Sequence, residues 1–361
     1  MQKIRKQIHT IYTISALSSF QIAGASWVAL LAARGFSLAE IGIAESAFHA
    51  ASLLFEIPSG VIADVFGRRT SMILSQCMAL LSALLMVLSR SLTGVCLGLM
   101  FSAWGYNFSS GTREALAYDT LKSGGQEEEY LSYSSLEYAI YRFGNACAIL
   151  CAGLALVMGY RKAYLLDMVL MGLGLLCCFR LEEIVIEREQ FEGTVSQRLG
   201  RCFRESFQFL RQNGSSIALM LWNALVGSIA TLTAFFLQAR LTKAGLPNFW
   251  LGPGLFLITL GGAIGAKIAP ALRKWRYKNI SLICILGVGL GLALSLWPVP
   301  GVMLLGGVVG NLFDDLLQVR TDALLNERFP SSQRATLVSV SSLCFSVVMI
   351  LMAPLMGWLL G

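Results

Sequence analysis

The sequence predicts an all-α integral membrane protein, and three observations lead to this prediction. Of the 361 residues, 56% are hydrophobic and 14% are charged, whereas about a quarter of the residues in a soluble domain are charged. Apolar runs recur along the chain, each of about 20 residues and long enough to cross a hydrocarbon core about 30 Å thick. The runs are too long for barrel strands, and a helix satisfies its own backbone in lipid.

Eleven spans are expected, six before a charged segment and five after it. Several are interrupted by Gly, Ser or a charge, which suits helices that face one another or a cavity. The expected spans are residues 11–33, 38–63, 72–89, 92–118, 131–158 and 163–178, then 216–238, 249–271, 280–296, 299–325 and 335–360.

The basic residues predict the orientation of these spans. With a cytoplasmic N-terminus, most of the 28 Lys and Arg residues fall on the inner side, and Arg142 alone lies inside a span. This distribution follows the positive-inside rule. The net charge of +7 is therefore a topology signal, and no basic soluble face indicates nucleic-acid binding. We expect a multi-pass protein of the plasma (inner) membrane.

The residues of enzyme and metal chemistry are sparse. The nine cysteines contain no paired CxxC, and His9 and His49 are the two histidines, so no metal site is expected. No GxxxxGK[ST] phosphate loop is present, which argues against direct use of ATP. A membrane enzyme would need a cluster of His, Asp or Cys near an interface. The sequence therefore predicts neither an enzyme nor a cofactor.

A short polar stretch, EIPSGVIADVFGRRT at 56–70, interrupts the apolar pattern between the second and third spans. Small residues there let two helices approach closely, and an acid can accept hydrogen bonds at a helix N-terminus. A positive-inside anchor would need only the basic residues. An anchor would not require the acid and the two glycines that accompany them. The stretch contains five residues at a defined spacing, Gly60, Asp64, Gly67, Arg68 and Arg69.

These five residues match the pattern G-x-x-x-D-x-x-G-[RK]-[RK], and the sequence resembles the major facilitator superfamily. The stretches EIPSG, SGTREALAYDTL at 110–121 and NERFPSSQRATLVSV at 326–340 are similar to the branch of sugar and drug efflux permeases. The resemblance implies two pseudo-symmetric bundles and a charge relay of Asp64, Arg68 and Asp119. It also implies that Asp64 faces the N-terminal end of the eleventh helix, where it latches the outward-open state.

An internal repeat supports two like-oriented halves. The segment LSYSSL at 131–136 is similar to VSVSSL at 338–343, and the two are offset by 207 residues. In the second copy of the loop, Gly265, Arg273 and Lys274 keep the pattern but Ala269 replaces the acid, so a relay there must be weaker or built differently. Parallel repeats of this kind bind substrate between the halves. The expected domains are a six-helix bundle at 1–180, a cytoplasmic linker at 181–214 and a five-helix bundle at 215–361. The linker helix from Val195 has two interpretations, an amphipathic helix on the inner leaflet or a plain solvated helix.

Polar groups deep in the spans are the expected functional residues, because they are costly there. His49, Asn107, Arg142 and Asp314 lie roughly 15 to 18 Å from a span end. Asp314 is the best coupling carboxylate, with Glu45 and Glu56 as alternatives. Helix packing, or for Arg142 and Asp314 an ion pair, is the structural alternative. Further candidates for substrate contact are Trp104, Tyr138, Trp222 and Asn223.

The predicted function is secondary active transport of a small organic solute, with export favoured and protons as the candidate coupling ion. The partners are then this solute, protons and membrane lipid, and we expect a monomer. The alternative is a transporter-like sensor or scaffold that moves nothing. The offset of 207 would place the partner of the sixth span beyond Gly361, so the twelfth helix of the superfamily is expected to be missing, and truncation is the favoured explanation.

Overall fold

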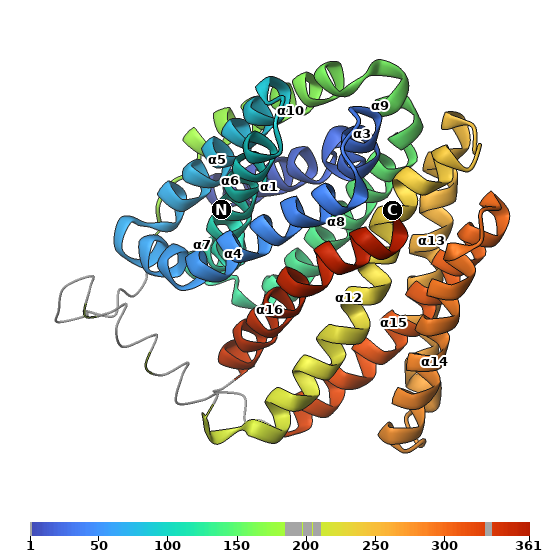
Figure 1. Ribbon diagram of the computed structural model, residues 1–361. Coiled ribbons are helices and arrows are strands. Elements are labelled where there is room, and N and C mark those ends of the chain that lie inside the picture. The colour runs from blue at the N-terminus through green and yellow to red at the C-terminus, as the bar shows by residue number, and fades with distance from the viewer. Residues whose placement is uncertain (1, 185–196, 198–203, 205–210, 329–333) are drawn as a thin grey trace. The chain divides into compact units, whose positions relative to one another are not determined.

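The structure is a computed structural model that describes residues 2–184, 197, 204, 211–328 and 334–361. All regular structure in these residues is helical (Figure 1). The expected linker helix from Val195 lies largely outside the described residues. The helices are α1 Gln2–Ser19, α2 Ile22–Ala25, α3 Trp27–Ala33, α4 Leu38–Phe66, α5 Arg68–Leu88, α6 Leu92–Ser109, α7 Thr112–Lys122, η1 Glu127–Glu129, α8 Tyr130–Leu150, α9 Ala152–Met158, α10 Tyr160–Phe179, α12 Gly214–Lys243, α13 Asn248–Ile268, η2 Ala269–Leu272, α14 Tyr277–Leu296, α15 Pro300–Arg328 and α16 Arg334–Leu360.

Eight of the described helices are long and apolar enough to cross a membrane. A ninth candidate is the segment through α8 and α9, which bends by 49° at their junction. The all-helical membrane fold predicted from the apolar runs is therefore confirmed. The count of eleven crossings, split six and five, stays a prediction.

The first predicted span, residues 11–33, is divided among three helices in the structure. The chain breaks at Phe20 and Gln21 and again at Ser26, which gives α1, α2 and α3. Asp167 of α10 holds the break, because its carboxylate accepts hydrogen bonds from the backbone N–H groups of Ile22 at 2.8 Å and Gly24 at 3.0 Å. Asp167 is 1% exposed. A buried acid thus satisfies backbone donors that a continuous helix would pair internally.

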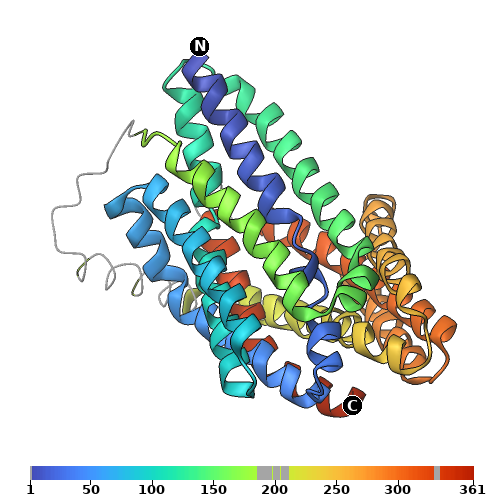
Figure 2. The ribbon, with the colours of Figure 1, turned by 90° about the horizontal axis from the view of Figure 1, so that it is seen from above.

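By their contacts, the described residues fall into two compact units. The first unit comprises Met1–Ala25, Ala50–Ala148 and Met158–Glu205. Its core joins α1, α5, α7, α8 and α10 through Ile11, Met72, Leu116, Tyr133 and Cys178. Figure 2 shows α1 and α10 side by side, as their contacts require.

The second unit comprises Ser26–His49, Ile149–Val157 and Ser206–Gly361. One core cluster joins Ala29 of α3 and Ala152 of α9 to Leu237 of α12 and Leu251 of α13. Another lies among α12, α14 and α15. This unit includes α3, the start of α4 and nearly all of α9. The predicted domain bounds at residues 180 and 215 stay a prediction.

Glycines bring backbones close together at several places in the second unit, including Gly42 and Gly252. A Cβ on Gly42 of α4 would lie 2.2 Å from the carbonyl oxygen of Ala353 in α16. A Cβ on Gly252 of α13 would lie 2.0 Å from the carbonyl oxygen of Leu150. No side chain fits at such distances, so these glycines permit a helix approach that any other residue would prevent.

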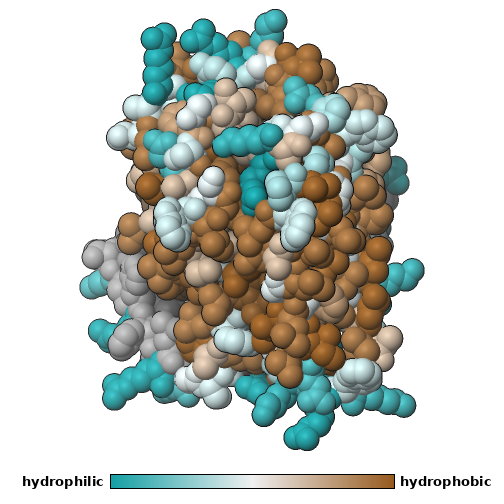
Figure 3. Space-filling view, turned by 45° about the vertical axis from the view of Figure 1, so that its right-hand side comes forward, coloured by the Kyte–Doolittle hydropathy of each residue, from teal (hydrophilic) through white to brown (hydrophobic). Residues whose placement is uncertain are grey.

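The outer surface is strongly apolar. On the face drawn in Figure 3, hydrophobic side chains form a broad band, and hydrophilic side chains gather at its two ends. Exposed side chains include Leu54, Leu131, Phe143 and Trp358, each at least 74% exposed. Such exposure is expected of helices that face lipid, and it would be a liability in water.

Candidate functional site

The turn between α4 and α5 carries the polar stretch and is shaped by Gly67. This glycine has φ +97°, a left-handed conformation in which glycine is favoured. A Cβ here would also lie 2.7 Å from the carboxylate of Glu183. Glu183 accepts hydrogen bonds from the backbone N–H groups of Arg68 at 2.8 Å and Arg69 at 2.7 Å. An acid near the start of the predicted linker thus caps α5, where the helix dipole favours negative charge.

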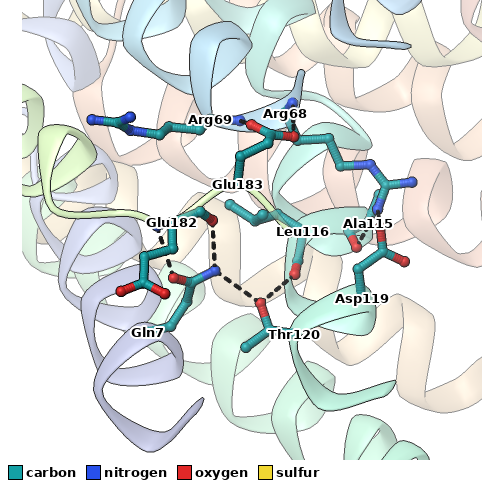
Figure 4. A network of polar contacts seen from close by, with 9 residues as sticks. All are labelled: Gln7, Arg68, Arg69, Ala115, Leu116, Asp119, Thr120, Glu182 and Glu183. Atoms are coloured by element: carbon teal, nitrogen blue, oxygen red, sulfur yellow. Dashed lines mark hydrogen bonds and ion pairs between the residues drawn. The ribbon is translucent and has the colours of Figure 1, made fainter. Parts of the chain in front are cut away.

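Arg68 connects this turn to α7. Its guanidinium donates a hydrogen bond to the carbonyl oxygen of Ala115 at 2.5 Å and forms an ion pair with Asp119, one turn further along α7 (Figure 4). Arg69 turns the other way and donates to the carbonyl oxygen of Phe179 in α10 at 2.9 Å. The two arginines therefore tie the start of α5 to two different helices.

A second set of hydrogen bonds ties α1 into the same network. The side chain of Gln7 donates to the hydroxyl of Thr120 at 3.1 Å and to the carbonyl oxygen of Glu182 at 3.0 Å. It also accepts a hydrogen bond from the backbone N–H of Glu182 at 2.9 Å. Figure 4 shows this set beside the Arg68–Asp119 pair. The residues just after α10 are thereby fixed to α1, α5 and α7.

Of the predicted latch residues, the structure brings Gly67, Arg68, Arg69 and Asp119 together. Gly60 and Asp64 both lie within α4, and Asp64 is exposed. Asp64 was expected to be able to accept hydrogen bonds at a helix N-terminus, but the acid that does so at α5 is Glu183. Its predicted role toward the eleventh helix stays a prediction.

The second copy of the loop is built differently. There Arg320 of α15 donates hydrogen bonds to the carbonyl oxygens of Arg273 and Trp275, each at 3.4 Å. In the first copy an arginine of the loop reaches the helix, whereas in the second an arginine of the helix reaches the loop. The contact with the second loop uses neutral acceptors and long distances, in keeping with the absence of the acid at Ala269.

A charged cluster inside the first unit was not foreseen as a site. Arg113 of α7 forms ion pairs with Glu137 of α8 at 3.1 Å and with Glu114 at 3.5 Å. Ser15 of α1 donates a hydrogen bond to Glu137 at 2.8 Å. Glu137 is 8% exposed. Arg113 lies on the same helix as Asp119, so α7 takes part in both ion pairs.

The second unit contains a cavity of about 480 Å³ among α12, α15 and α16. Figure 1 shows α12 between α15 and α16. Polar and apolar residues both line this cavity. The lining residues are Met220, Asn223, Ala224, Gly227, Thr231, Asp314, Gln318, Asp322, Leu325, Asn326, Ser341, Ser342 and Phe345.

Four polar residues of α15 recur at every fourth position along the cavity: Asp314, Gln318, Asp322 and Asn326. Gln318 donates hydrogen bonds to both carboxylate oxygens of Asp322, at 3.1 and 3.2 Å. Gln318 also accepts one from Asn223, which in turn accepts one from Thr321 at 3.1 Å. Residues four apart share one face of a helix, so this spacing turns a polar stripe toward α12.

Asp314 differs from the other members of the stripe. Among the described residues no hydrogen bond or ion pair involves its carboxylate. A Cβ on Gly227 of α12 would lie 3.2 Å from its Oδ1 atom, so the glycine makes room for it. Phe345 of α16 flanks the same glycine, and the titratable groups near Asp314 in the described structure are Asp315 and Cys284 of α14.

His49 lies at the contact between α4 and α16. Its Nε2 atom is 3.3 Å from Glu45, and its Nδ1 atom is 3.3 Å from the hydroxyl of Ser346. Its ring packs edge-on against Phe345, at a centroid distance of 5.8 Å. His49 therefore contacts a residue of the cavity wall without itself lining the cavity.

The other predicted residues contact neighbouring groups outside this cavity, and their predicted roles stay predictions. Asn107 donates to the carbonyl oxygen of Ser52 at 2.8 Å and accepts from its hydroxyl at 2.9 Å. Trp104 packs against Phe55 and Phe101. Arg142 donates to the hydroxyl of Tyr138 at 2.8 Å. Trp222 donates to Ser281 at 3.2 Å and does not line the cavity.

With this geometry established, the family follows from comparison. A sequence profile described as "Major Facilitator Superfamily" matches residues 9–313. The match covers most of the chain, so the chain belongs to the Major Facilitator Superfamily. It is therefore a multi-pass membrane protein and a secondary transporter of small solutes, and it is not an enzyme.

Solved structures support the fold. A mutant of the nucleoside transporter NupG is 14% identical, with a TM-score of 0.78, and the alignment covers 96% of this chain and 90% of that one. A bacterial homolog of the human lysosomal transporter Spinster is 14% identical, with a TM-score of 0.72 and coverage of 97% and 81%. A D-xylose–proton symporter is 11% identical, with a TM-score of 0.65 and coverage of 97% and 88%. None of the curated proteins matches the chain.

Proposed function

We propose that the chain exports a small organic solute, such as a drug, sugar or metabolite, by alternating access coupled to protons. The observation that carries this proposal is the cavity beside Asp314, a carboxylate without a hydrogen-bond partner in the described structure. A carboxylate at this depth is costly, and such groups mark solute or proton pathways. The protein would act as a monomer in the plasma (inner) membrane with its N-terminus in the cytoplasm.

Two kinds of helix contact support alternating access. The Arg68–Asp119 pair and its neighbours, with Asp64 and Gly60, are proposed as the latch of one conformational state. The close approaches at Gly42 and Gly252 are proposed as a packed gate of another state. A transporter needs contacts of this kind that form and break as the site faces each side.

The test uses purified protein in vesicles that contain a pH-sensitive dye. Compounds are first selected by their ability to raise the unfolding temperature of the protein. When a selected compound is added and a pH gradient is imposed, the protein should carry both the compound and protons across the membrane. Asp314→Asn should abolish the proton signal, because the amide keeps the shape of the side chain but does not titrate. The matched control is Asp315→Asn, since Asp315 lies against Gly262 of α13 instead of the cavity.

An unchanged proton signal in Asp314→Asn would assign coupling to another group. Binding of a compound without movement of any compound or proton would instead favour the sensor or scaffold. The two variants differ by one position on the same helix, so loss of charge alone cannot account for a difference between them.

A further inference from the structure

The walls of the cavity among α12, α15 and α16 carry charge of one sign. Asp314 and Asp322 are both acids, and the remaining polar lining side chains are neutral amides and hydroxyls. Within the described lining there is no lysine, arginine or histidine. The basic side chain of α15 closest in sequence, Arg320, donates instead to the carbonyl oxygens of Arg273 and Trp275. No cation among the described lining residues therefore balances these acids.

The two carboxylates differ in how far their charge is compensated. Asp322 accepts two hydrogen bonds from Gln318, whereas Asp314 accepts none in the described structure. Moving a charge out of water without a partner costs free energy, and a bound ion of opposite charge offsets part of this desolvation cost. Asp314 is thus the position in this cavity where a cationic group would gain most.

The rest of the wall suits an apolar body attached to that cation. Phe345, Met220 and Leu325 supply aromatic, thioether and aliphatic surface to the cavity. An aromatic ring attracts a cation placed over its face, and Phe345 adjoins the same glycine as Asp314. A volume of about 480 Å³ lies in the range of drug-sized ligand sites.

We propose that this cavity binds an organic monocation with a flat apolar body, and that Asp314 is its counter-charge. The amides of Gln318, Asn223 and Asn326 then offer hydrogen bonds at the polar end of the cavity. This inference rests on the proposed transport function, because the bound cation is taken to be the exported solute. It selects cations from the wider set of drugs, sugars and metabolites.

Equilibrium binding of ethidium, a flat aromatic monocation, to the purified full chain tests this assignment without any transport measurement. Fluorescence anisotropy should show saturable binding to the unmodified protein. Asp314→Asn should weaken it by about tenfold, as expected for loss of a charge-assisted contact. Asp315→Asn should leave the affinity unchanged, and Asp322→Asn should have an intermediate effect, since Gln318 already compensates Asp322. Thermal unfolding of each variant verifies that it is folded.

Neutral competitors complete the experiment. Uridine and D-xylose should not displace ethidium, because neither offers a positive charge. Absence of saturable ethidium binding, or equal affinity in Asp314→Asn, would overturn the cation assignment. Displacement by either neutral compound would also overturn it. Each of these results leaves the proposed transport function to be decided by the proton-flux assay, so the two failures are distinguishable.

Discussion

Two regions of the molecule hold their helices together by opposite means. At the start of α5 the contacts are charged: Glu183 caps the helix, and Arg68 pairs with Asp119. In the second unit the contacts at Gly42 and Gly252 bring backbone against backbone with no side chain between. The contact at α5 depends on charge. Its ion pair is partly exposed, so water can replace each partner when the contact opens. The contacts at Gly42 and Gly252 depend on volume, because the closely packed backbones leave no space for an added atom.

Because one contact depends on charge and the other on volume, the two should respond to different substitutions. A neutral substitution of equal size should affect the charged region and leave the glycine region intact. Added volume should affect the glycine region. The expected effects fall in the following order.

The largest effect is expected from Gly252→Val. The added Cβ alone would lie 2.0 Å from the carbonyl oxygen of Leu150, so α13 must move away from residues 149–157. Overpacking typically costs about 1 to 3 kcal/mol, and we expect solute flux to be abolished. The control is Gly289→Val in α14, where a Cβ meets nothing within 4 Å. Full flux in Gly252→Val would show that this approach is not a gate.

Asp119→Asn should reduce solute flux several-fold. This is the size of effect expected when a hydrogen bond between two charged groups loses one of the charges. The amide keeps the volume but loses the charge that Arg68 meets, while the contact of Arg68 with the carbonyl oxygen of Ala115 remains. Circular dichroism should be unchanged. Glu128→Gln, at an exposed acid of η1, is the matched control. Equal flux in both variants would remove the pair from the mechanism.

Asp64→Asn should lower flux by a smaller factor with little effect on folding, because Asp64 is exposed and buries little apolar surface. Initial rates measured beside Asp119→Asn give the comparison. Turnover equal to that of the unmodified protein would exclude Asp64 from the latch that the sequence motif predicts.

The smallest effect is expected from Glu183→Gln. The side chain can still accept a hydrogen bond from Arg68 or Arg69 but no longer complements the dipole of α5, a loss of about 0.3 to 1 kcal/mol. The unfolding temperature should fall modestly. Glu182→Gln should leave the unfolding temperature unchanged, because Glu182 bonds to Gln7 through its backbone. Identical shifts in the two variants would argue against a capping role.

The sequence predicted the fold well because apolar runs and the loop pattern are local signals. It missed the break after α1, since the acid that stabilises the break, Asp167, is about 145 residues away. It missed Glu183 as the cap of α5 for the same reason. The stripe from Asp314 to Asn326 could have been found, because three members recur at every fourth residue of the predicted span 299–325 and Asn326 follows at the same spacing.

Side-chain partners were the least predictable part of the candidate site. Asn107 and Asp314 are counterparts in the internal repeat, yet Asn107 is engaged by Ser52 and Asp314 lines a cavity. Equivalent positions in the two halves therefore need not share a role. Packing against neighbouring helices decides between them, and that packing is not encoded in a single span.

Alternating access of the Asp314 cavity is the central claim, and cysteine labelling measures it most directly. A cysteine at position 342, on the cavity wall, is introduced after the nine native cysteines are replaced. A thiol reagent that cannot cross the membrane is then added to one side of sealed vesicles or to the other. The account predicts labelling from both sides, with the ratio shifted by Asp119→Asn. Labelling from a single side, unchanged by that substitution, would contradict it.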